Sequence, residues 1–278
     1  VGLGGRWDAT TATHPVVTCV TGIGLDHIRI LGDTLEAIAG EKAAVIKRGQ
    51  RCVLGAGTAT PASVEDVLLA RAAEQGVRPV LLRPESPEDA PGELEAGEMR
   101  EHPELPRASY RVTRRPERIG GGLVLDVTTP RTTYLDLCAA KPVYQAANIA
   151  CAVVVAETYL DRELDQYHLS DHVSECPTPG RFNVVEGSPM HLIDAAHNPQ
   201  SVRAFLDSLE EMEPEVADRP QLLCAVLADK DVDGIVALLA PAFPRVCVTA
   251  TSSPRALAPD ELARAFRAHG VEPAAVYP

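Results

Sequence analysis

The last third of the chain repeats one pattern three times, an apolar, strand-like run followed by a segment with helical spacing. The three pairs are residues 190–194 and 199–212, residues 221–227 and 232–239, and residues 246–251 and 260–269. Strands that alternate with helices are typical of a parallel sheet that carries helices on its faces. The pattern therefore predicts an α/β fold with a doubly wound, mostly parallel sheet.

Polar side chains follow each of these predicted strands. They are Asp194, His197 and Asn198 after the first strand, Asp229, Lys230 and Asp231 after the second, and Ser252, Ser253 and Arg255 after the third. In doubly wound sheets, ligands bind just beyond the carboxyl ends of the strands. Asn198 also has a structural explanation, because it can cap a helix that begins at Pro199. Asp194 and His197 have no such explanation and are candidates for a binding site.

The first part of the chain has a similar β/α alternation. A strand-like run at residues 16–20, for example, precedes a predicted helix at about residues 34–47. A second unit of the chain begins near Pro179, where the three strand and helix pairs start. We therefore expect two domains, residues 1–178 and residues 179–278.

One predicted helix places a lysine among apolar residues. Its inward face consists of Leu35, Ile38, Ala39, Lys42, Val45 and Ile46, which recur at helical spacing. Asp33 with Glu36 gives a plausible start signal for this helix. Burial disfavours the ammonium form and lowers the pKa of a lysine. Lys42 is therefore either a side chain that extends its charged end to solvent or a functional amine held near a charged partner.

The composition limits the class of protein. The chain has 278 residues, of which 45% are hydrophobic, and a formal net charge of -13. Nucleic-acid binding needs clustered Lys and Arg, so this charge argues against a nucleic-acid partner. The 7 cysteines form no C-x-x-C pair, and most lie in apolar runs that are typical of buried thiols. With no run of about 18 apolar residues and no visible signal peptide, we expect no membrane partner and a cytoplasmic location.

A series of short motifs runs through nearly the whole chain. They are Val1-Gly-Leu-Gly-Gly-Arg-Trp-Asp-Ala-Thr10, Thr21-Gly-Ile-Gly-Leu-Asp-His27 with Leu31-Gly32, Ile38-Ala-Gly-Glu-Lys-Ala43, Gln145 with Asn148, Pro179-Gly-Arg-Phe182, Asp194-Ala-Ala-His-Asn-Pro199 and Asp229-Lys-Asp231. Any one of them alone is a weak signal. Together, in this order and at these spacings, they resemble the folylpolyglutamate synthase and dihydrofolate synthase branch of the Mur ligase superfamily.

The resemblance implies a fold and a reaction. The fold would be α/β with two domains, part of a Mur-ligase-type central ATPase domain followed by a Rossmann-like, mostly parallel sheet domain that ligates glutamate. The reaction would be ATP-dependent, with a substrate carboxylate phosphorylated and then joined to the amino group of L-glutamate. The acceptor would be dihydropteroate or a folate. Members of this family are commonly monomeric, so we expect a monomer.

The resemblance also assigns roles to residues of the first domain. In the family the histidine that matches His27 is a magnesium ligand, and the lysine that matches Lys42 is carbamylated. A lysine with a lowered pKa offers a neutral amine that can capture carbon dioxide, and the carbamate is an anionic oxygen ligand for Mg²⁺. We therefore expect ATP and Mg²⁺ as cofactors, with His27 and Lys42 in catalysis. Arg6 and Asp8 match the pterin-side loop and are expected to contact the acceptor.

Further matches concern the nucleotide. Asn148, Arg181, Asp194 and His197 match positions that contact ATP in the family. A guanidinium suits phosphate oxygens, and a carboxylate accepts hydrogen bonds from a ribose hydroxyl. Lys230 could neutralise charge on the transferred phosphoryl group or hold the incoming glutamate. The alternative interpretation is that Lys230 is an ordinary loop lysine ahead of a helix, without a role in the reaction.

The chain departs from the family at its start. It contains no G-x-x-x-x-G-K-[ST] loop for the ATP phosphates, which the family has upstream of the position of Val1. We therefore expect that a polypeptide limited to these residues does not ligate. Two other interpretations stay open. One is a Mur ligase that acts on a peptidoglycan precursor, and the other is a nucleotide-binding relative that has lost catalysis.

Overall fold

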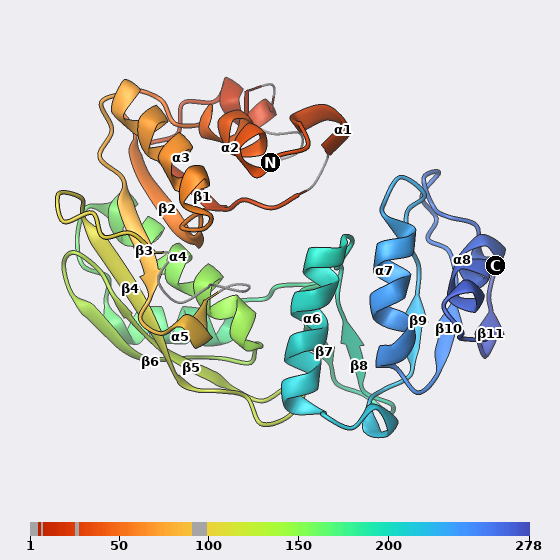
Figure 1. Cartoon of the computed structure of the whole chain (residues 1–278). Helices are drawn as coiled ribbons and strands as arrows, with labels where there is room; N and C mark the ends of the chain where they lie inside the picture. Colours follow the sequence, from red (N-terminus) through yellow and green to blue (C-terminus); the bar gives the residue numbers. More distant parts are fainter. Residues whose placement is uncertain (1–4, 7, 26–27, 91–98) are drawn as a thin grey trace. The chain divides into compact units, whose positions relative to one another are not determined.

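The structure, a computed structural model, describes residues 5–6, 8–25, 28–90 and 99–278. The chain divides into two compact units (Figure 1). Unit 1 consists of residues 1–116 and 122–176, and unit 2 consists of residues 117–121 and 177–278. The short segment 117–121 lies between two strands of unit 1 in the sequence, and it packs in unit 2, where Ile119 contacts the hydrophobic core.

Unit 1 is built on a sheet of six strands that follow one another in sequence order. They are β1 (Val17–Gly22), β2 (Arg51–Gly57), β3 (Val80–Pro84), β4 (Arg107–Arg114), β5 (Leu123–Thr128) and β6 (Thr133–Ala139). The pairs from β1 to β4 are parallel, and β4, β5 and β6 pair antiparallel. The predicted β/α alternation thus covers the first half of this sheet, where helices connect the parallel strands.

Helices cover both faces of the sheet in unit 1. They are α1 (Ile28–Leu31), α2 (Leu35–Ala43), α3 (Ala62–Glu74), α4 (Ala146–Leu160) and α5 (Gln166–Glu175), with short 3-10 helices η1 (Ala9–Ala12), η2 (Pro87–Asp89) and η3 (Val143–Gln145). Helices α2 and α3 share one hydrophobic cluster with β1 and β2. Helix α4 contributes to a second cluster on the other face, where Figure 1 draws it against the strands. Successive residues of a strand point to opposite faces, so Cys52 and Leu54 of β2 lie in the first cluster and Val53 lies in the second.

Helix α4 is the most apolar helix of unit 1. The segment Val143–Leu160, which combines η3 and α4, is long and apolar enough by length and composition to cross a membrane. In this fold α4 contacts β1, β2, β3, β4 and β5 instead, and its inner residues form part of the hydrophobic core. The helix is therefore a core helix of unit 1.

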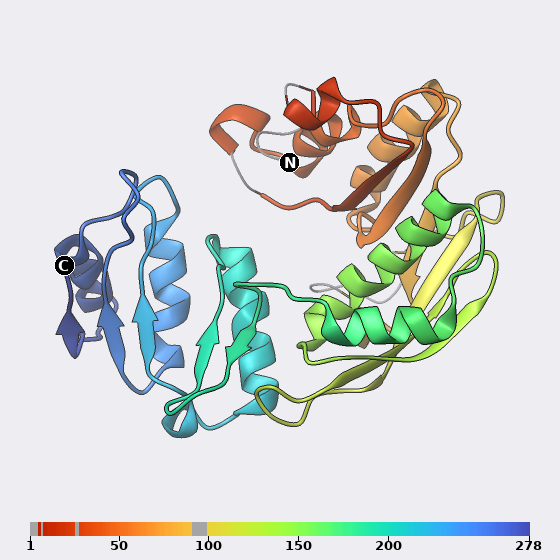
Figure 2. The same cartoon turned by 180° about the vertical axis from the view of Figure 1, so that it is seen from behind.

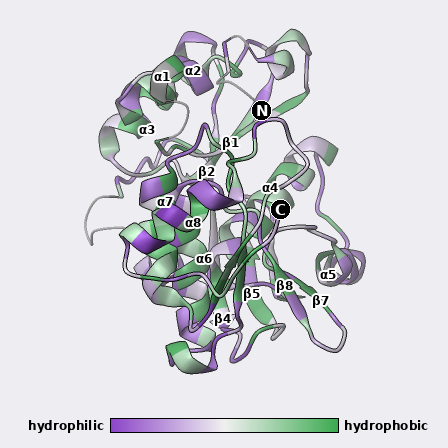
Figure 3. Ribbon diagram, turned by 90° about the vertical axis from the view of Figure 1, so that its right-hand side faces the viewer, coloured by the Kyte–Doolittle hydropathy of each residue, from purple (hydrophilic) through white to green (hydrophobic). Residues whose placement is uncertain are grey.

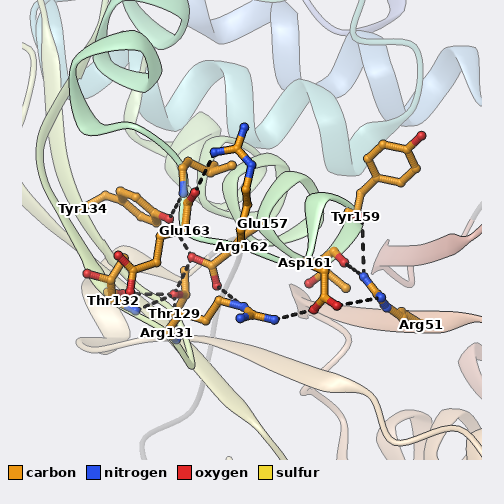
Figure 4. A network of polar contacts seen from close by, with 12 residues as sticks. Arg51, Thr129, Arg131, Thr132, Tyr134, Glu157, Tyr159, Asp161, Arg162 and Glu163 are labelled. Carbon is orange, nitrogen blue, oxygen red and sulfur yellow. Dashed lines mark hydrogen bonds and ion pairs between the residues drawn. The ribbon is translucent and has the colours of Figure 1, made fainter.

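The carboxyl end of α4 is held by a network of polar contacts (Figure 4). The buried carboxylate of Glu157 accepts hydrogen bonds from the Tyr134 hydroxyl at 2.6 Å and from the Thr129 hydroxyl at 2.9 Å. One turn later, Asp161 lies between the guanidinium groups of Arg131 at 2.5 Å and Arg51 at 3.2 Å. These contacts connect α4 to β2 and β6, so the helix has a fixed position on the sheet.

Unit 2 contains two small sheets, three α-helices and two short 3-10 helices. The elements are β7 (Asn183–Val185), β8 (His191–Ile193), α6 (Pro199–Met212), η4 (Val216–Asp218), β9 (Leu222–Cys224), α7 (Val232–Leu239), η5 (Ala240–Ala242), β10 (Val246–Val248), α8 (Pro259–Ala268) and β11 (Ala275–Val276). Strands β9, β10 and β11 form a parallel sheet, seen from behind in Figure 2, whereas β7 and β8 form an antiparallel pair. Helices α6, α7 and α8 turn apolar residues toward one core, and Figure 3 shows hydrophilic and hydrophobic residues mixed along α6.

The α/β class with a mostly parallel sheet is confirmed, with two differences of detail. The first predicted strand of unit 2 is β8, which pairs with β7 and does not join the parallel sheet. In unit 1, the helix that carries Lys42 begins after Thr34, whose hydroxyl accepts a hydrogen bond from the Ala37 amide at 3.2 Å. Thr34 thus caps α2, not Asp33, because the hydroxyl at this position reaches an amide that lacks a partner within the helix.

Candidate functional site

Asp194 connects two of the sequence motifs in unit 2. It follows β8, and one of its carboxylate oxygens accepts a hydrogen bond from the Phe182 amide at 2.7 Å. The other oxygen accepts one from the Ala196 amide, also at 2.7 Å. In return, the Ala195 amide donates to the Gly180 carbonyl at 2.8 Å. The segment 179–182 is therefore fixed against the loop 194–198 by both side-chain and backbone hydrogen bonds.

The segment 179–182 has an unusual backbone, which explains two of its residues. Gly180 has a φ of +69°, a region that glycine adopts without steric cost. Phe182 also has a positive φ, 47°, and its buried ring contacts Phe205 with 5.7 Å between the centroids. Arg181 lies between these two residues and is exposed, with Nη1 at 3.5 Å from the Ala195 carbonyl. The turn thus buries Phe182 and presents the guanidinium of Arg181 to solvent.

The loop after β8 also sets the start of α6. The Asn198 side chain accepts a hydrogen bond from the Ser201 amide at 2.8 Å, and the Ser201 hydroxyl lies 3.2 Å from the Asn198 amide. This reciprocal capping confirms the structural explanation for Asn198 and Pro199. His197 is exposed, and its Nδ1 donates to the Ala195 carbonyl at 3.0 Å. That hydrogen bond holds the imidazole ring against the backbone of the loop.

The loop after β9 lies next to the loop after β8. Asp231 caps α7 by accepting a hydrogen bond from the Gly234 amide at 3.0 Å. A Cβ atom at Gly234 would lie 2.9 Å from Cγ of Pro199, the first residue of α6. The amino ends of α6 and α7 are therefore in close contact. Lys230, half-buried, immediately precedes the α7 cap and so belongs to the same edge of unit 2.

The loop after β10 completes this edge. The Arg255 guanidinium lies 2.5 Å from the Asp229 carboxylate, and the Ala228 amide donates to the Arg255 carbonyl at 2.8 Å. The hydrogen bond from Arg255 holds the pKa of Asp229 below its usual value. Asp229 is therefore an anion that is already paired within the protein. The polar residues that the sequence places after three strands do gather at one edge, which we call the loop edge of unit 2 (residues 179–182, 194–199, 228–234 and 253–256).

In unit 1, Lys42 is the second-to-last residue of α2 and is half-buried. Ile38 and Ala39 on the same helix are fully buried, so Lys42 lies where the apolar face of α2 meets the surface. Gly5 packs against this end of the helix, and its amide donates to the Glu41 carbonyl at 3.0 Å. A Cβ atom at Gly5 would lie 2.8 Å from the Lys42 carbonyl oxygen. Only glycine therefore fits where the amino-terminal segment reaches α2.

This contact places Arg6 beside Glu41, the residue that precedes Lys42 in the sequence. The Arg6 amide donates to the Glu41 carbonyl at 3.1 Å, and Nε of Arg6 lies 3.2 Å from the Glu41 carboxylate. Arg6 also lines a cavity of about 610 Å³ together with Lys47 and Arg71. Asp8 has a local role, because its carboxylate accepts hydrogen bonds from the Thr10 amide and hydroxyl and caps η1.

The remaining predicted residues of unit 1 are Asn148 and His27. Asn148 is exposed in the first turn of α4 and donates to the side-chain carbonyl of the buried Gln145 at 3.0 Å. His27 lies outside the described residues. Among residues 5–6, 8–25, 28–90 and 99–278, no group of three or more His, Cys, Asp or Glu side chains is arranged to hold a metal ion. The magnesium site with His27 and Lys42 thus stays a prediction.

The sequence identifies Asp194, Phe182 and Arg255 as positions, but it does not predict the contacts that these three residues make. Asp194 was a candidate for ligand contact, and the structure gives it two backbone hydrogen bonds between motifs. Phe182 anchors the turn that presents Arg181. Arg255 pairs with Asp229, and a charge pair between two loops that are 26 residues apart has no local sequence signature.

Comparison with known proteins agrees with this geometry. Residues 180–278 match the family described as Mur ligase, glutamate ligase domain. The match places residues 180–278, the carboxyl-terminal part of the chain, in the Mur ligase family. Within that family the relatives of the chain are the folylpolyglutamate synthases and dihydrofolate synthases.

Two of these relatives are similar over most of the chain. The dihydrofolate synthase/folylpolyglutamate synthase of Mycobacterium tuberculosis is 34% identical over 271 residues, which are 95% of this chain and 50% of the relative. The folylpolyglutamate synthase of Lacticaseibacillus casei is 27% identical over 92% of this chain and 54% of the relative. The chain thus spans about half the length of the curated relatives it matches.

Solved structures give the same relationship. The crystal structure of Mycobacterium tuberculosis folylpolyglutamate synthase complexed with ADP and AMPPCP superimposes with a TM-score of 0.77 and 32% identity. That alignment covers 97% of this chain and 55% of the solved chain. The resemblance recognised from the motifs is confirmed at the level of sequence and fold.

Proposed function

We propose that this chain is part of an ATP-dependent ligase that adds L-glutamate to dihydropteroate, to folates, or to both, through an acyl-phosphate intermediate. Residues 1–178 would form the central domain that binds ATP and the folate, and residues 179–278 the glutamate ligase domain. Support comes from the relatives, which are named as synthases of this kind. The alignment with the Mycobacterium tuberculosis relative covers 95% of this chain. We also propose, from the same resemblance, a monomeric enzyme of the cytoplasm.

The observation that carries the proposal is the loop edge of unit 2. The hydrogen bonds of Asp194 fix the turn that exposes Arg181, and the contact between the amino ends of α6 and α7 adds Lys230 to the same edge. Two cationic side chains on preorganised loops, beyond strand ends, suit a ligand with phosphate and carboxylate groups.

We assign the reaction roles accordingly. Arg181 would bind phosphate oxygens of ATP through its planar guanidinium, which offers two parallel N–H donors. Asp194 and His197 would complete the nucleotide site, with Asp194 also positioning the turn that carries Arg181. Lys230 would neutralise negative charge on the phosphoryl group during transfer or hold the carboxylate of the incoming glutamate. Asn148 of unit 1 would contact the nucleotide through its side-chain amide.

The first domain would hold the metal and the acceptor. Lys42 as a carbamate, together with His27, would hold Mg²⁺, which would supply electrostatic stabilisation of the phosphoryl group when bound. The position of Lys42 at the edge of the apolar face of α2 suits this role, because carbon dioxide and solvent can reach a half-buried amine. Arg6 and Asp8 would contact the pterin acceptor, and the cavity beside Arg6 provides space for one of its groups.

The proposal is tested by measuring glutamate-dependent release of ADP. The full-length gene product would be supplied with ATP, Mg²⁺ and L-glutamate, and with dihydropteroate, tetrahydrofolate or a muramyl nucleotide in separate reactions. Turnover with a pterin acceptor supports the proposal and separates the synthase activities. Turnover with the muramyl nucleotide, and with no pterin acceptor, would indicate a peptidoglycan-precursor ligase. If the protein is folded and releases no ADP with any acceptor, it would be a binding protein without catalysis.

A matched pair of variants connects the activity to the loop edge. Arg181→Ala removes the exposed guanidinium of the turn, whereas Arg264→Ala removes a guanidinium that is also exposed, on α8, where it pairs with Glu261. We expect Arg181→Ala to raise the KM for ATP about 10-fold or more, since a hydrogen-bonded charge contact contributes about 1.5–3 kcal/mol. Equal KM values for the two variants would remove Arg181 from the nucleotide site.

A further inference from the structure

Two cysteines from distant parts of the sequence meet in unit 1. The Sγ atoms of Cys19 and Cys151 lie 3.1 Å apart. Cys19 is on β1 and is half-buried, whereas Cys151 is on α4 and is only 4% exposed. Because 131 residues separate them in the sequence, from position 20 to position 150, the contact is created by the packing of α4 on the sheet.

The alternation of side chains along the strands explains why Cys19 meets Cys151 and not Cys52, a third cysteine nearby. In the parallel register of β1 and β2, Cys19 lies beside Val53, and both face the cluster that contains α4. Cys52 lies one position earlier on β2 and faces the opposite cluster, with α2 and α3. Cys52 is therefore a buried thiol close to Cys19 that points to the other side of the sheet.

We propose that Cys19 and Cys151 are a redox-active pair that closes to a disulfide when the protein meets a hydroperoxide. A disulfide has an S–S length of about 2.05 Å, so the two sulfur atoms need to approach by about 1 Å from their present separation. Side-chain rotation and a small shift of α4 supply such a distance without unfolding either element. All the cysteines are in the described part of the chain, and among them only Cys19 and Cys151 are in hydrogen-bond contact with each other.

The hydroperoxide is the oxidant that accepts the two electrons released when two thiols form a disulfide. The hydrogen bond from the Cys19 thiol lowers the pKa of Cys151, and the pKa of Cys19 is raised chiefly by the same hydrogen bond. The Cys151 thiolate attacks the peroxide oxygen, the O–O bond breaks, and a sulfenic acid forms with release of hydroxide. The Cys19 sulfur then attacks the Cys151 sulfur, the S–O bond breaks, and water leaves after the thiol proton is taken up. Two thiols and one hydrogen peroxide thus become one disulfide and two waters.

Closure would act on elements that carry candidate site residues. Cys151 lies one turn after Asn148 on α4, and β1 leads directly into the segment that contains His27. A displacement of about 1 Å at a catalytic group can lower a rate by about 100-fold. We therefore expect the oxidised protein to turn over more slowly and to recover with dithiothreitol. This consequence rests on the proposed function, whereas the formation of the disulfide does not.

The test is a peptide map of the full-length gene product after treatment with hydrogen peroxide. Free thiols are blocked with an alkylating reagent, and the protein is digested without reduction. We expect one cross-linked peptide pair that joins Cys19 to Cys151, lighter by two hydrogen atoms than the two peptides together, and its loss after reduction. The exposed Cys176 serves as an internal monitor of the peroxide dose.

Matched variants separate the pair from its neighbour. Cys52→Ala should form the cross-link as the wild type does, and Cys19→Ser, at the half-buried position, should form none and should keep its turnover under peroxide. The proposal is overturned if Cys176 is oxidised while Cys19 and Cys151 both remain alkylated thiols, or if Cys19 is found joined to Cys52. If the protein forms the cross-link but has no ligase activity, the proposed function is contradicted and the proposal of a redox-active pair is still supported.

Discussion

The carboxylate of Asp194 accepts hydrogen bonds from the amides of Phe182 and Ala196, each at 2.7 Å, and so holds two separate loops in one arrangement. One of these loops presents Arg181, and the other presents His197 and begins α6. Asp194 therefore determines the geometry of the loop edge of unit 2, in addition to any contact it makes with a ligand. A carboxylate that accepts two amide hydrogen bonds restricts loop motion more than a single contact would.

Replacement of Asp194 tests this positioning role. Asp194→Ala removes both acceptors and should lower turnover by about 100-fold, because loss of the loop geometry displaces Arg181 and His197 by the order of 1 Å. Asp194→Asn keeps one acceptor oxygen and should lie between wild type and Asp194→Ala. The measurement is glutamate-dependent ADP release, with circular dichroism as a check on folding. Equal rates for Asp194→Ala and wild type would exclude the role.

Gly234 is required where α6 and α7 meet. A methyl group there would lie 2.5 Å from Oδ2 of Asp231, which caps α7, and 2.9 Å from Pro199. We expect Gly234→Ala to displace the cap and to lower the free energy of unfolding by about 1–2 kcal/mol. Urea denaturation with a fixed m-value measures the change.

The control for this prediction is Gly40→Ala, which should have the opposite sign. Gly40 lies inside α2 with nothing within 4 Å of an added Cβ atom. Alanine is a better helix former than glycine, so this variant should gain about 0.5–1 kcal/mol. A loss of stability in Gly40→Ala equal to that in Gly234→Ala would show that the contacts of Gly234 are not the cause.

Much of unit 2 was predictable because its signals are local. Asn198 and Pro199 mark the start of α6, and the observed helix has the predicted bounds of residues 199–212. The predicted bounds of α7, residues 232–239, are also observed. The partner of a strand is not encoded locally, since it depends on which edge remains free after folding. For that reason the pairing of β8 with β7 could not be predicted.

The candidate site was predictable as a set of positions but not as a set of contacts. Helical spacing places Lys42 on the apolar face of α2, but it does not reveal that the side chain is only half-buried. The hydrogen bonds of Asp194 and the pairing of Asp229 with Arg255 connect loops that lie far apart in sequence. Such contacts are properties of the folded chain.

The buried hydroxyl of Tyr134 predicts a loss of stability at alkaline pH. Burial, assisted by the hydrogen bond to Glu157, raises the pKa of Tyr134 from 10.0 to about 12. The neutral hydroxyl is therefore favoured in the folded state, and its contribution is complete below the unfolded pKa of about 10. That contribution, about 2–3 kcal/mol, should be lost as pH rises from about 10 to about 12.

Tyr134→Phe tests this prediction. At neutral pH the variant should be less stable by about 1–3 kcal/mol, because Glu157 loses a donor and the Leu164 amide loses its acceptor at 2.8 Å. Between about pH 10 and pH 12 its stability should fall less steeply than that of wild type. Tyr167→Phe, at a position 76% exposed, is the control. Identical alkaline slopes for wild type and Tyr134→Phe would contradict the assignment.

Arg6 should affect the acceptor and not the nucleotide. Its amide and guanidinium both contact Glu41, beside Lys42, and its side chain lines the cavity of unit 1. We expect Arg6→Ala to raise the KM for the pterin acceptor by about 10-fold, because the variant loses one hydrogen-bonded charge contact. The KM for ATP should change little. Arg48→Ala, an exposed arginine shortly after α2, is the control. A change in the KM for ATP alone would place Arg6 in a different site.

The most direct measurement is the fate of a heavy-oxygen label in the acceptor carboxylate. The full-length gene product would be incubated with ATP, Mg²⁺, L-glutamate and a pterin acceptor labelled with heavy oxygen at its terminal carboxylate. The account predicts an acceptor that gains one glutamyl residue and inorganic phosphate that carries one heavy oxygen atom, because the carboxylate is phosphorylated before the amide forms. Glutamylation with no label in the phosphate would contradict the acyl-phosphate route, and the absence of any glutamylated product from a folded protein would contradict the proposed function.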